Sequence, residues 1–153
     1  MKKLRKIKKI IDFLKFKIIS RYILIIINGN SMEPELTNKS LKIVDKNHFN
    51  ISKIKRFEIV YFVHQIRKKD KPIMYVKRVI GLPNEWIEIK GNNLYVNDKK
   101  INCKYWQKSH FDKNYVWDTN LDDFVVIGDN LNFSTDSRKF GTIKSRNIIG
   151  KIL

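Results

Sequence analysis

The sequence is poor in the residues that bind metals or form covalent cross-links. Cys103 is its only cysteine, which excludes an intramolecular disulfide. The three histidines, His48, His64 and His110, are scattered along the chain, and no His or Cys cluster has the spacing of metal ligands. We therefore predict no metal site and no cofactor, and we expect each histidine to be a surface or hydrogen-bonded side chain rather than a catalyst.

Acidic residues are scarce as well. The chain has 15 Asp and Glu residues against 32 Lys and Arg residues, which gives a formal net charge of +17. Residues 1–21 contain nine of these basic residues and one acidic residue, Asp12. Such a charge suits anionic lipid or nucleic acid. A bias towards Lys, Ile and Asn throughout the chain explains the excess equally well, without any partner.

The sequence also lacks an uninterrupted apolar run of about 20 residues, the length that a membrane-spanning helix needs. Its basic start, followed by the apolar run 22–27, nevertheless has the layout of a signal anchor. A helix here would present one apolar face, which suits the membrane interface. That face would consist of Ile7, Ile11, Leu14 and Ile18.

We predict that residues 1–22 form a basic helix that anchors the chain in the cell membrane or lies at its interface. The alternative is an amphipathic helix that covers the protein's own core. If the segment does anchor the chain, the excess of basic residues at its start predicts a cytoplasmic N-terminus. The rest of the chain would then lie on the outer side of the membrane.

From residue 23 onward, short runs of β-branched and aromatic residues alternate with turns rich in Gly, Asn and Asp. No stretch after residue 30 keeps a 3.6-residue period. We therefore predict one mainly β domain over residues 23–153, without repeats or a linker, and a long loop or irregular hairpin over 102–120. The predicted strands cover residues 23–27, 41–44, 58–63, 74–80, 86–90, 94–96 and 124–127.

Two residues of this domain suit hydrolysis of a peptide bond, which needs a nucleophile and a base. Ser31 follows a glycine turn that lets backbone and substrate approach closely. Lys77 lies in the apolar run 74–80, where alternation places it on one face with Tyr75 and Val79. Burial would lower the pKa of its amine and make it a base near neutral pH. Most lysines within strands, however, simply extend into solvent.

Four blocks of the sequence, in order, resemble those of type I signal peptidases, which are serine proteases of the S26 family with a Ser-Lys dyad. The second block is similar to a structural strand of the family, and the third is nearly identical to the box that carries the base. The blocks are Gly29-Asn30-Ser31-Met32-Glu33-Pro34, residues 56–62, residues 75–83, and Gly128-Asp129-Asn130 with Ser134-Thr135-Asp136-Ser137-Arg138 and Gly141.

The resemblance implies a membrane-associated serine endopeptidase that cleaves signal peptides from exported preproteins. Ser31 would be the nucleophile, its backbone N–H would help to form the oxyanion hole, and Lys77 would be the general base. Ser134 would hydrogen-bond the Lys77 amine and orient it. Asp136 and Arg138 would pair with each other. These two residues would support the site structurally, as would Gly128, Asp129 and Asn130.

Within the same motifs, we expect Met32 to pack and Arg78 to contact solvent or a loop. The resemblance implies preproteins and membrane lipid as partners, and no nucleic acid. It leaves the oligomeric state open. It covers residues 23–153 and has two departures near the site: Glu35 replaces a usual Thr, and 131–133 replaces a more polar run.

Three alternative functions remain. A specialised maturation protease of the same superfamily, acting on one or a few substrates, would suit the short chain and weak anchor. A self-cleaving repressor protease shares the Ser-Lys dyad but normally carries a helical DNA-binding domain, for which residues 1–22 are too short. A basic module that binds membranes or nucleic acid without catalysis would rest on the +17 charge alone.

Overall fold

A computed structural model describes residues 21–46, 54–66, 69, 71–106 and 110–153. The predicted N-terminal helix lies almost entirely outside these residues, as does His48, and the boundary between segments 1–22 and 23–153 stays a prediction. Among the described residues, no helix has the length and apolar character needed to cross a membrane.

Strands dominate the described part of the chain, as the sequence predicts. The elements are β1 (Tyr22–Ile26), β2 (Leu41–Asp45), β3 (Ile59–His64), β4 (Ile73–Gly81), β5 (Trp86–Lys90), β6 (Asn93–Val96), β7 (Lys99–Ile101), β8 (Tyr115–Asp118), β9 (Asp123–Ile127), η3 (Leu131–Phe133), α2 (Ser137–Phe140), β10 (Ile143–Lys144), η4 (Ser145–Asn147) and β11 (Ile148–Ile152).

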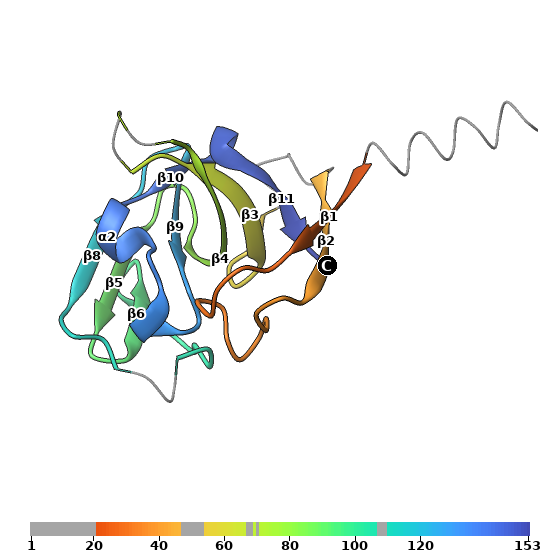
Figure 1. The fold of residues 1–153 in the computed structure, drawn as a ribbon. Helices are drawn as coiled ribbons and strands as arrows, with labels where there is room; N and C mark the ends of the chain where they lie inside the picture. Colours follow the sequence, from red (N-terminus) through yellow and green to blue (C-terminus); the bar gives the residue numbers. More distant parts are fainter. Residues whose placement is uncertain (1–20, 47–53, 67–68, 70, 107–109) are drawn as a thin grey trace, which may run out of the picture.

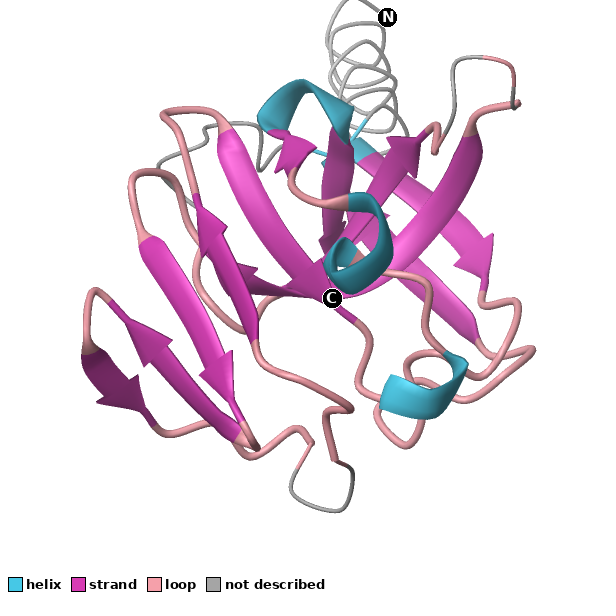
Figure 2. Cartoon of the chain, turned by 90° about the vertical axis from the view of Figure 1, so that its left-hand side faces the viewer, coloured by secondary structure: helices cyan, strands magenta, loops and turns pink. Residues whose placement is uncertain are grey.

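The strands form two antiparallel sheets. The larger has the order β1-β2-β11-β3-β4-β9-β10, and the smaller has the order β7-β6-β5-β8. The small sheet lies at the opposite end of the molecule from β1 and β2 (Figure 1), and a second view shows it standing beside the large sheet (Figure 2). Strands β1 and β7 are therefore edges, each paired on one side only.

Strand β9 lies between two hydrophobic cores, and all five of its residues are buried. Val125 and Ile127 pack with the small sheet in one core. Phe124 and Val126 face the other core, which lies against β3 and β11. Strand alternation sends neighbouring side chains to opposite faces, so the unbroken apolar run 124–127 is buried on both faces. The short elements that follow β9 are thereby fixed to the centre of the fold.

The seven predicted strands all form, within one or two residues of the expected bounds. The prediction of a long loop or irregular hairpin over 102–120 is wrong in part, because residues 115–118 form β8, a regular partner of β5. Tyr115 and Trp117 lie on one face of β8, stack with ring centroids 5.6 Å apart, and pack on the core. Alternation over four residues is too short a signal to distinguish such an edge strand from a loop.

Strands β1 and β2 carry exposed apolar side chains on one face. The register pairs Leu24 with Ile43 and Ile26 with Leu41, so these four side chains share that face. Each is between 44% and 63% exposed. We call this surface the β1–β2 patch. It is unusual because apolar residues on a soluble surface are normally scattered rather than gathered on two neighbouring strands.

Candidate active site

Ser31 lies in the loop that joins β1 to β2. The turn before it contains Gly29 with φ +91°, a conformation that glycine adopts without steric cost. The base of the loop is closed by two backbone hydrogen bonds, from Ile27 N–H to the Ser40 carbonyl (2.9 Å) and from Lys39 N–H to the Ile27 carbonyl (2.8 Å). Met32, only 1% exposed, packs into the core beside the loop, as predicted. Burial of Met32 and these hydrogen bonds hold the Ser31 hydroxyl at a defined position.

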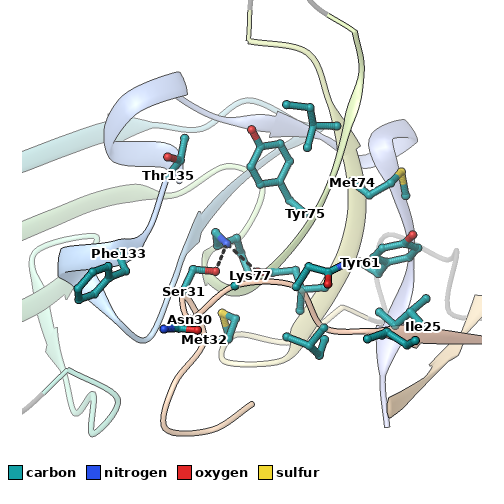
Figure 3. Close-up of a pocket in the computed structure, with 16 residues that line it drawn as sticks. Ile25, Asn30, Ser31, Met32, Tyr61, Met74, Tyr75, Lys77, Phe133 and Thr135 are labelled. Carbon is teal, nitrogen blue, oxygen red and sulfur yellow. Dashed lines mark hydrogen bonds between the residues drawn. The ribbon is translucent and has the colours of Figure 1, made fainter. Parts of the chain in front are cut away.

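Lys77 reaches Ser31 from β4, across 46 residues of sequence. Its Nζ donates a hydrogen bond to Ser31 Oγ (2.7 Å) and another to the Val76 carbonyl (2.9 Å). Figure 3 shows the two side chains pointing towards each other. Lys77 is only 3% exposed, so it does not extend into solvent as most strand lysines do.

Burial changes the acidity of this amine. Desolvation disfavours the charged form and lowers the pKa of Lys77 from 10.5 to about 8. The Asp136 and Asp129 carboxylates oppose this shift, and Arg138 adds to it to a smaller extent. A substantial fraction of the amine is therefore neutral near pH 8, and a neutral amine can accept a proton from a hydroxyl at 2.7 Å.

Asp136 and Arg138 form a buried, bidentate ion pair, which places them together as expected. Arg138 Nε lies 2.8 Å from Asp136 Oδ1, and its Nη2 lies 2.9 Å from Oδ2. Asp136 is fully buried and also accepts a hydrogen bond from Gly128 N–H (3.1 Å). Because this pair is buried and shares other hydrogen bonds, it is more than a surface salt bridge. Through its hydrogen bond with Gly128, Asp136 connects the residue after β9 to the start of α2.

Arg78 corrects one expectation, because it is buried instead of reaching solvent. Its Nε and Nη2 bind the Asp129 carboxylate at 2.8 and 2.5 Å, and its Nη1 donates to the Phe57 carbonyl (2.8 Å). The guanidinium lies 3.6 Å from the centre of the Tyr105 ring. Glu35, which replaces the Thr that the family usually has at this position, also contacts the ion pair: its Oε2 is 3.6 Å from Arg78 Nη2.

A cleft of about 670 Å³ opens over Ser31 and Lys77. Residues of β1 and β4 line one end, and Phe133 and Thr135 lie towards the other end (Figure 3). The lining is mostly apolar, with Tyr61 and Tyr75 among its aromatic members. No group of three His, Cys, Asp or Glu residues in the described ranges is arranged to hold a metal ion. The chemistry that this cleft offers is therefore that of a hydroxyl next to a buried amine.

The sequence matches a family model described as "Signal peptidase, peptidase S26" over residues 10–153, nearly the whole chain. This chain belongs to the signal peptidase family. It is 36% identical to signal peptidase I of Bacillus caldolyticus, over 94% of this chain and 82% of that protein. It is 33% identical to signal peptidase I P of Bacillus subtilis subsp. natto, over 97% of this chain and 90% of that protein.

A solved structure agrees with this assignment. The crystal structure of a signal peptidase I from Enterococcus faecalis V583 matches with a TM-score of 0.56 and 25% identity, covering 65% of this chain and 97% of that one. The fold is thus signal-peptidase-like, and this family member is a serine endopeptidase of the signal peptidase I type.

The predicted hydrogen bond from Ser134 to Lys77 is not formed in this signal peptidase. Ser134 Oγ is buried and has no hydrogen-bond partner among the described residues. Ser134 packs closely against Gly128, the residue that directly follows β9. Its orienting role therefore stays a prediction, which would require Lys77 Nζ to turn towards it during the reaction.

The backbone at Ser31 is hydrogen-bonded through its carbonyl and not through its N–H, within the described part of the chain. Asn130 N–H donates to the Ser31 carbonyl (3.1 Å), which ties the loop to the segment after β9. Within the described ranges, nothing accepts a hydrogen bond from the Ser31 backbone N–H. A backbone N–H without an acceptor, next to a reactive hydroxyl, is the kind of group that can donate to a developing oxyanion.

Sequence reasoning did not assign the residues that line the cleft of this signal peptidase outside the motif boxes. Ile25 and Met74 come from β1 and β4, two strands far apart in the sequence, and meet only in the folded sheet. Phe133 is the clearest case, because it is 71% exposed beside the site. The sequence contains one indication that Phe133 is unusual: it lies in a run, 131–133, where the family usually has more polar residues.

Proposed function

We propose that this signal peptidase cleaves signal peptides from exported preproteins, with Ser31 as nucleophile and Lys77 as general base. The observation that carries the proposal is the 2.7 Å contact between Lys77 Nζ and Ser31 Oγ in a buried setting. A pKa of about 8 gives the amine the basicity that a general base needs near neutral pH.

The reaction follows in two steps. Neutral Lys77 takes the Ser31 proton as Oγ attacks the scissile carbonyl, and the Ser31 N–H donates to the oxyanion. The protonated amine then gives its proton to the leaving nitrogen as the peptide bond breaks, leaving an acyl-enzyme. Water, deprotonated by Lys77, attacks this ester and releases the acid product and the Ser31 hydroxyl.

The residues after β9 support this dyad. In our proposal, Gly128 gives room for Ser134, which would orient the Lys77 amine once substrate is bound. The ion pair of Asp136 with Arg138 would hold this segment in place, and the pair of Asp129 with Arg78 would fix it to β4. Asn130 would keep the nucleophile loop against it through the Ser31 carbonyl.

The sheet edges favour an extended substrate. Strand β1 pairs only with β2, and β4 pairs with β9 only from Arg78 onward, so Ile73–Lys77 is bonded on one side by β3 alone. Both edges border the cleft. A segment of preprotein bound there would gain backbone hydrogen bonds, which is how extended peptides add to open sheets.

We also propose that the enzyme works at the cell membrane, with the N-terminus of the predicted anchor 1–22 in the cytoplasm and domain 23–153 on the outer side. The β1–β2 patch supports this arrangement, because it lies on the strand that directly follows the basic segment. Exposed apolar side chains beside basic residues are the pattern of a membrane-binding surface.

The test is cleavage of a purified preprotein by the full chain, its Ser31→Ala and Lys77→Ala variants, and a Lys99→Ala control on the distant edge strand β7. We expect the control to match the parent and both site variants to lose at least about 10³-fold in kcat. In the parent, kcat/KM should rise about tenfold per pH unit below pH 8 and level off above it. An active Lys77→Ala variant would disprove the mechanism.

The same assay addresses the alternative functions. A parent that cleaves one preprotein and spares several others would favour a specialised maturation protease. A parent that cleaves none, but binds DNA or lipid in a salt-sensitive manner, would favour a non-enzymatic module.

A further inference from the structure

Phe133 is an aromatic side chain held in an exposed position next to the site. It is 71% exposed, although the residues on each side of its segment are anchored in the fold. It ends η3, and Ser134, which directly follows it, is buried. A single exposed apolar side chain is ordinary, but Phe133 also lines the cleft that contains Ser31 and Lys77, where a bound peptide would cover its ring.

The segment that carries Phe133 is rigidly attached. Leu131, two residues earlier, is buried in the core. The Leu131 carbonyl accepts a hydrogen bond from Arg138 Nη2 (2.9 Å), and Asn130 N–H donates to the Ser31 carbonyl (3.1 Å). The backbone that carries Phe133 is therefore positioned relative to Ser31.

Phe133 and the free edge of β1 lie towards different ends of the cleft. In Figure 3, Phe133 lies on one side of Ser31 and Ile25 on the other. An extended peptide whose bond is cut at Ser31 must leave the site on both sides. If the residues before the cut pair with the edges of β1 and β4, as proposed above, the residues after the cut pass over Phe133.

We propose that Phe133 is a specificity residue that contacts the leaving side of the substrate and selects an apolar, preferably aromatic, side chain among the first residues after the cut. This inference rests on the proposed function. Contact between two aromatic rings favours such a substrate by a modest amount, which corresponds to about fivefold in kcat/KM. Phe133 is thus a substrate-contacting residue that takes no part in proton transfer.

The test is a set of soluble peptides that are identical up to the cut and carry Phe or Ser at the first, second or third position after it. The full-length parent should prefer Phe at one or more of these positions by about fivefold in kcat/KM. Phe133→Ala should abolish that preference, and Phe133→Tyr should restore it. Leu121→Ala, which removes a 79% exposed side chain in the turn before β9, is the matched control and should keep the preference.

The outcomes separate this inference from the proposed function. If the parent shows no preference, or if Phe133→Ala keeps it, the assignment of Phe133 is wrong while the dyad stands. A second peptide set, varied at the three positions before the cut, checks the direction of the substrate: a Phe preference there that Phe133→Ala abolishes would mean that Phe133 contacts the residues before the cut. If Phe133→Ala weakens binding to phospholipid vesicles and leaves selectivity unchanged, Phe133 contacts lipid instead. Cleavage that persists in Ser31→Ala would overturn the dyad itself.

Discussion

Lys77 shows what a buried base costs the protein that carries it. Its pKa falls from 10.5 to about 8, so keeping the amine charged in the folded state at pH 7 disfavours folding by about 3 kcal/mol. Methionine has a similar length and no charge. We therefore expect Lys77→Met to abolish cleavage and to raise the free energy of unfolding at pH 7 by about 1 to 3 kcal/mol, measured by urea denaturation.

The pH dependence distinguishes this effect from a general improvement in packing. The folded state binds the Lys77 proton more weakly than the unfolded state, so the penalty is complete below pH 8 and disappears as pH rises towards 10.5. The stability gain of Lys77→Met over the parent should therefore shrink between pH 8 and pH 10. A gain that stays constant would contradict the assignment, and Lys99→Met, at an exposed position, should show none.

At the scale of elements, the end of β9 shows how closely the nucleophile loop and the last motif box are packed. A Cβ on Gly128 would lie 2.5 Å from the Ser31 carbonyl oxygen and would also collide with Ser134 Oγ. We expect Gly128→Ala to push these segments apart, to lower kcat at least about tenfold, and to destabilise the fold by about 1 to 3 kcal/mol. Thermal unfolding and peptide cleavage measure the two effects.

A second glycine provides the control for this prediction. Gly91 has open space around it, and its φ of +56° is its only constraint. Gly91→Ala should cost about 1 kcal/mol of stability through backbone strain and leave cleavage unchanged. If both variants behaved alike, close packing at Gly128 would not be what positions Ser31.

Some strands of the fold could be predicted from the sequence, and others could not. The strands with clear alternation or apolar runs, such as β5 and β9, were predictable because their pattern depends on local burial. Strand β7 has only three residues, and β8, the partner of β5, lies in a part of the sequence without sustained periodicity. The local sequence therefore indicated neither strand. The place of Lys77 in an apolar strand allowed either burial or extension into solvent, and only the resemblance of residues 75–83 to the box that carries the base favoured burial.

The surroundings of Lys77 could not be derived in this way. Arg78 is buried because Asp129, 51 residues away, meets it across the sheet, and only the pairing of β4 with β9 creates that contact. The cleft lining has the same origin, since Ile25, Tyr61 and Phe133 belong to separate elements. Contacts that depend on register and sheet order are not encoded in local pattern.

At the scale of the whole molecule, two features would act together in the membrane binding that we propose. The excess of basic residues would attract anionic lipid, an interaction that salt screens. The β1–β2 patch would add apolar contact that salt does not screen, and it lies on the strand that leads into the nucleophile loop. If the patch faces the bilayer, the cleft opens close to the surface from which a signal peptide emerges.

Because salt screens charge attraction and leaves apolar contact unchanged, the salt concentration should distinguish these two contributions to lipid binding. The full-length variant Leu24→Gln, Leu41→Gln should bind anionic phospholipid vesicles about tenfold or more weakly than the parent in 0.5 M salt, where charge attraction is screened. At low salt the difference should shrink, because the basic residues are unchanged. Sedimentation with vesicles measures both. The control is Val116→Gln, Leu121→Gln, since these two apolar side chains are also exposed and lie outside the β1–β2 patch, on β8 and in the turn before β9. Equal losses in both variants would mean that the membrane does not select the β1–β2 patch, and that the bilayer is contacted by another surface.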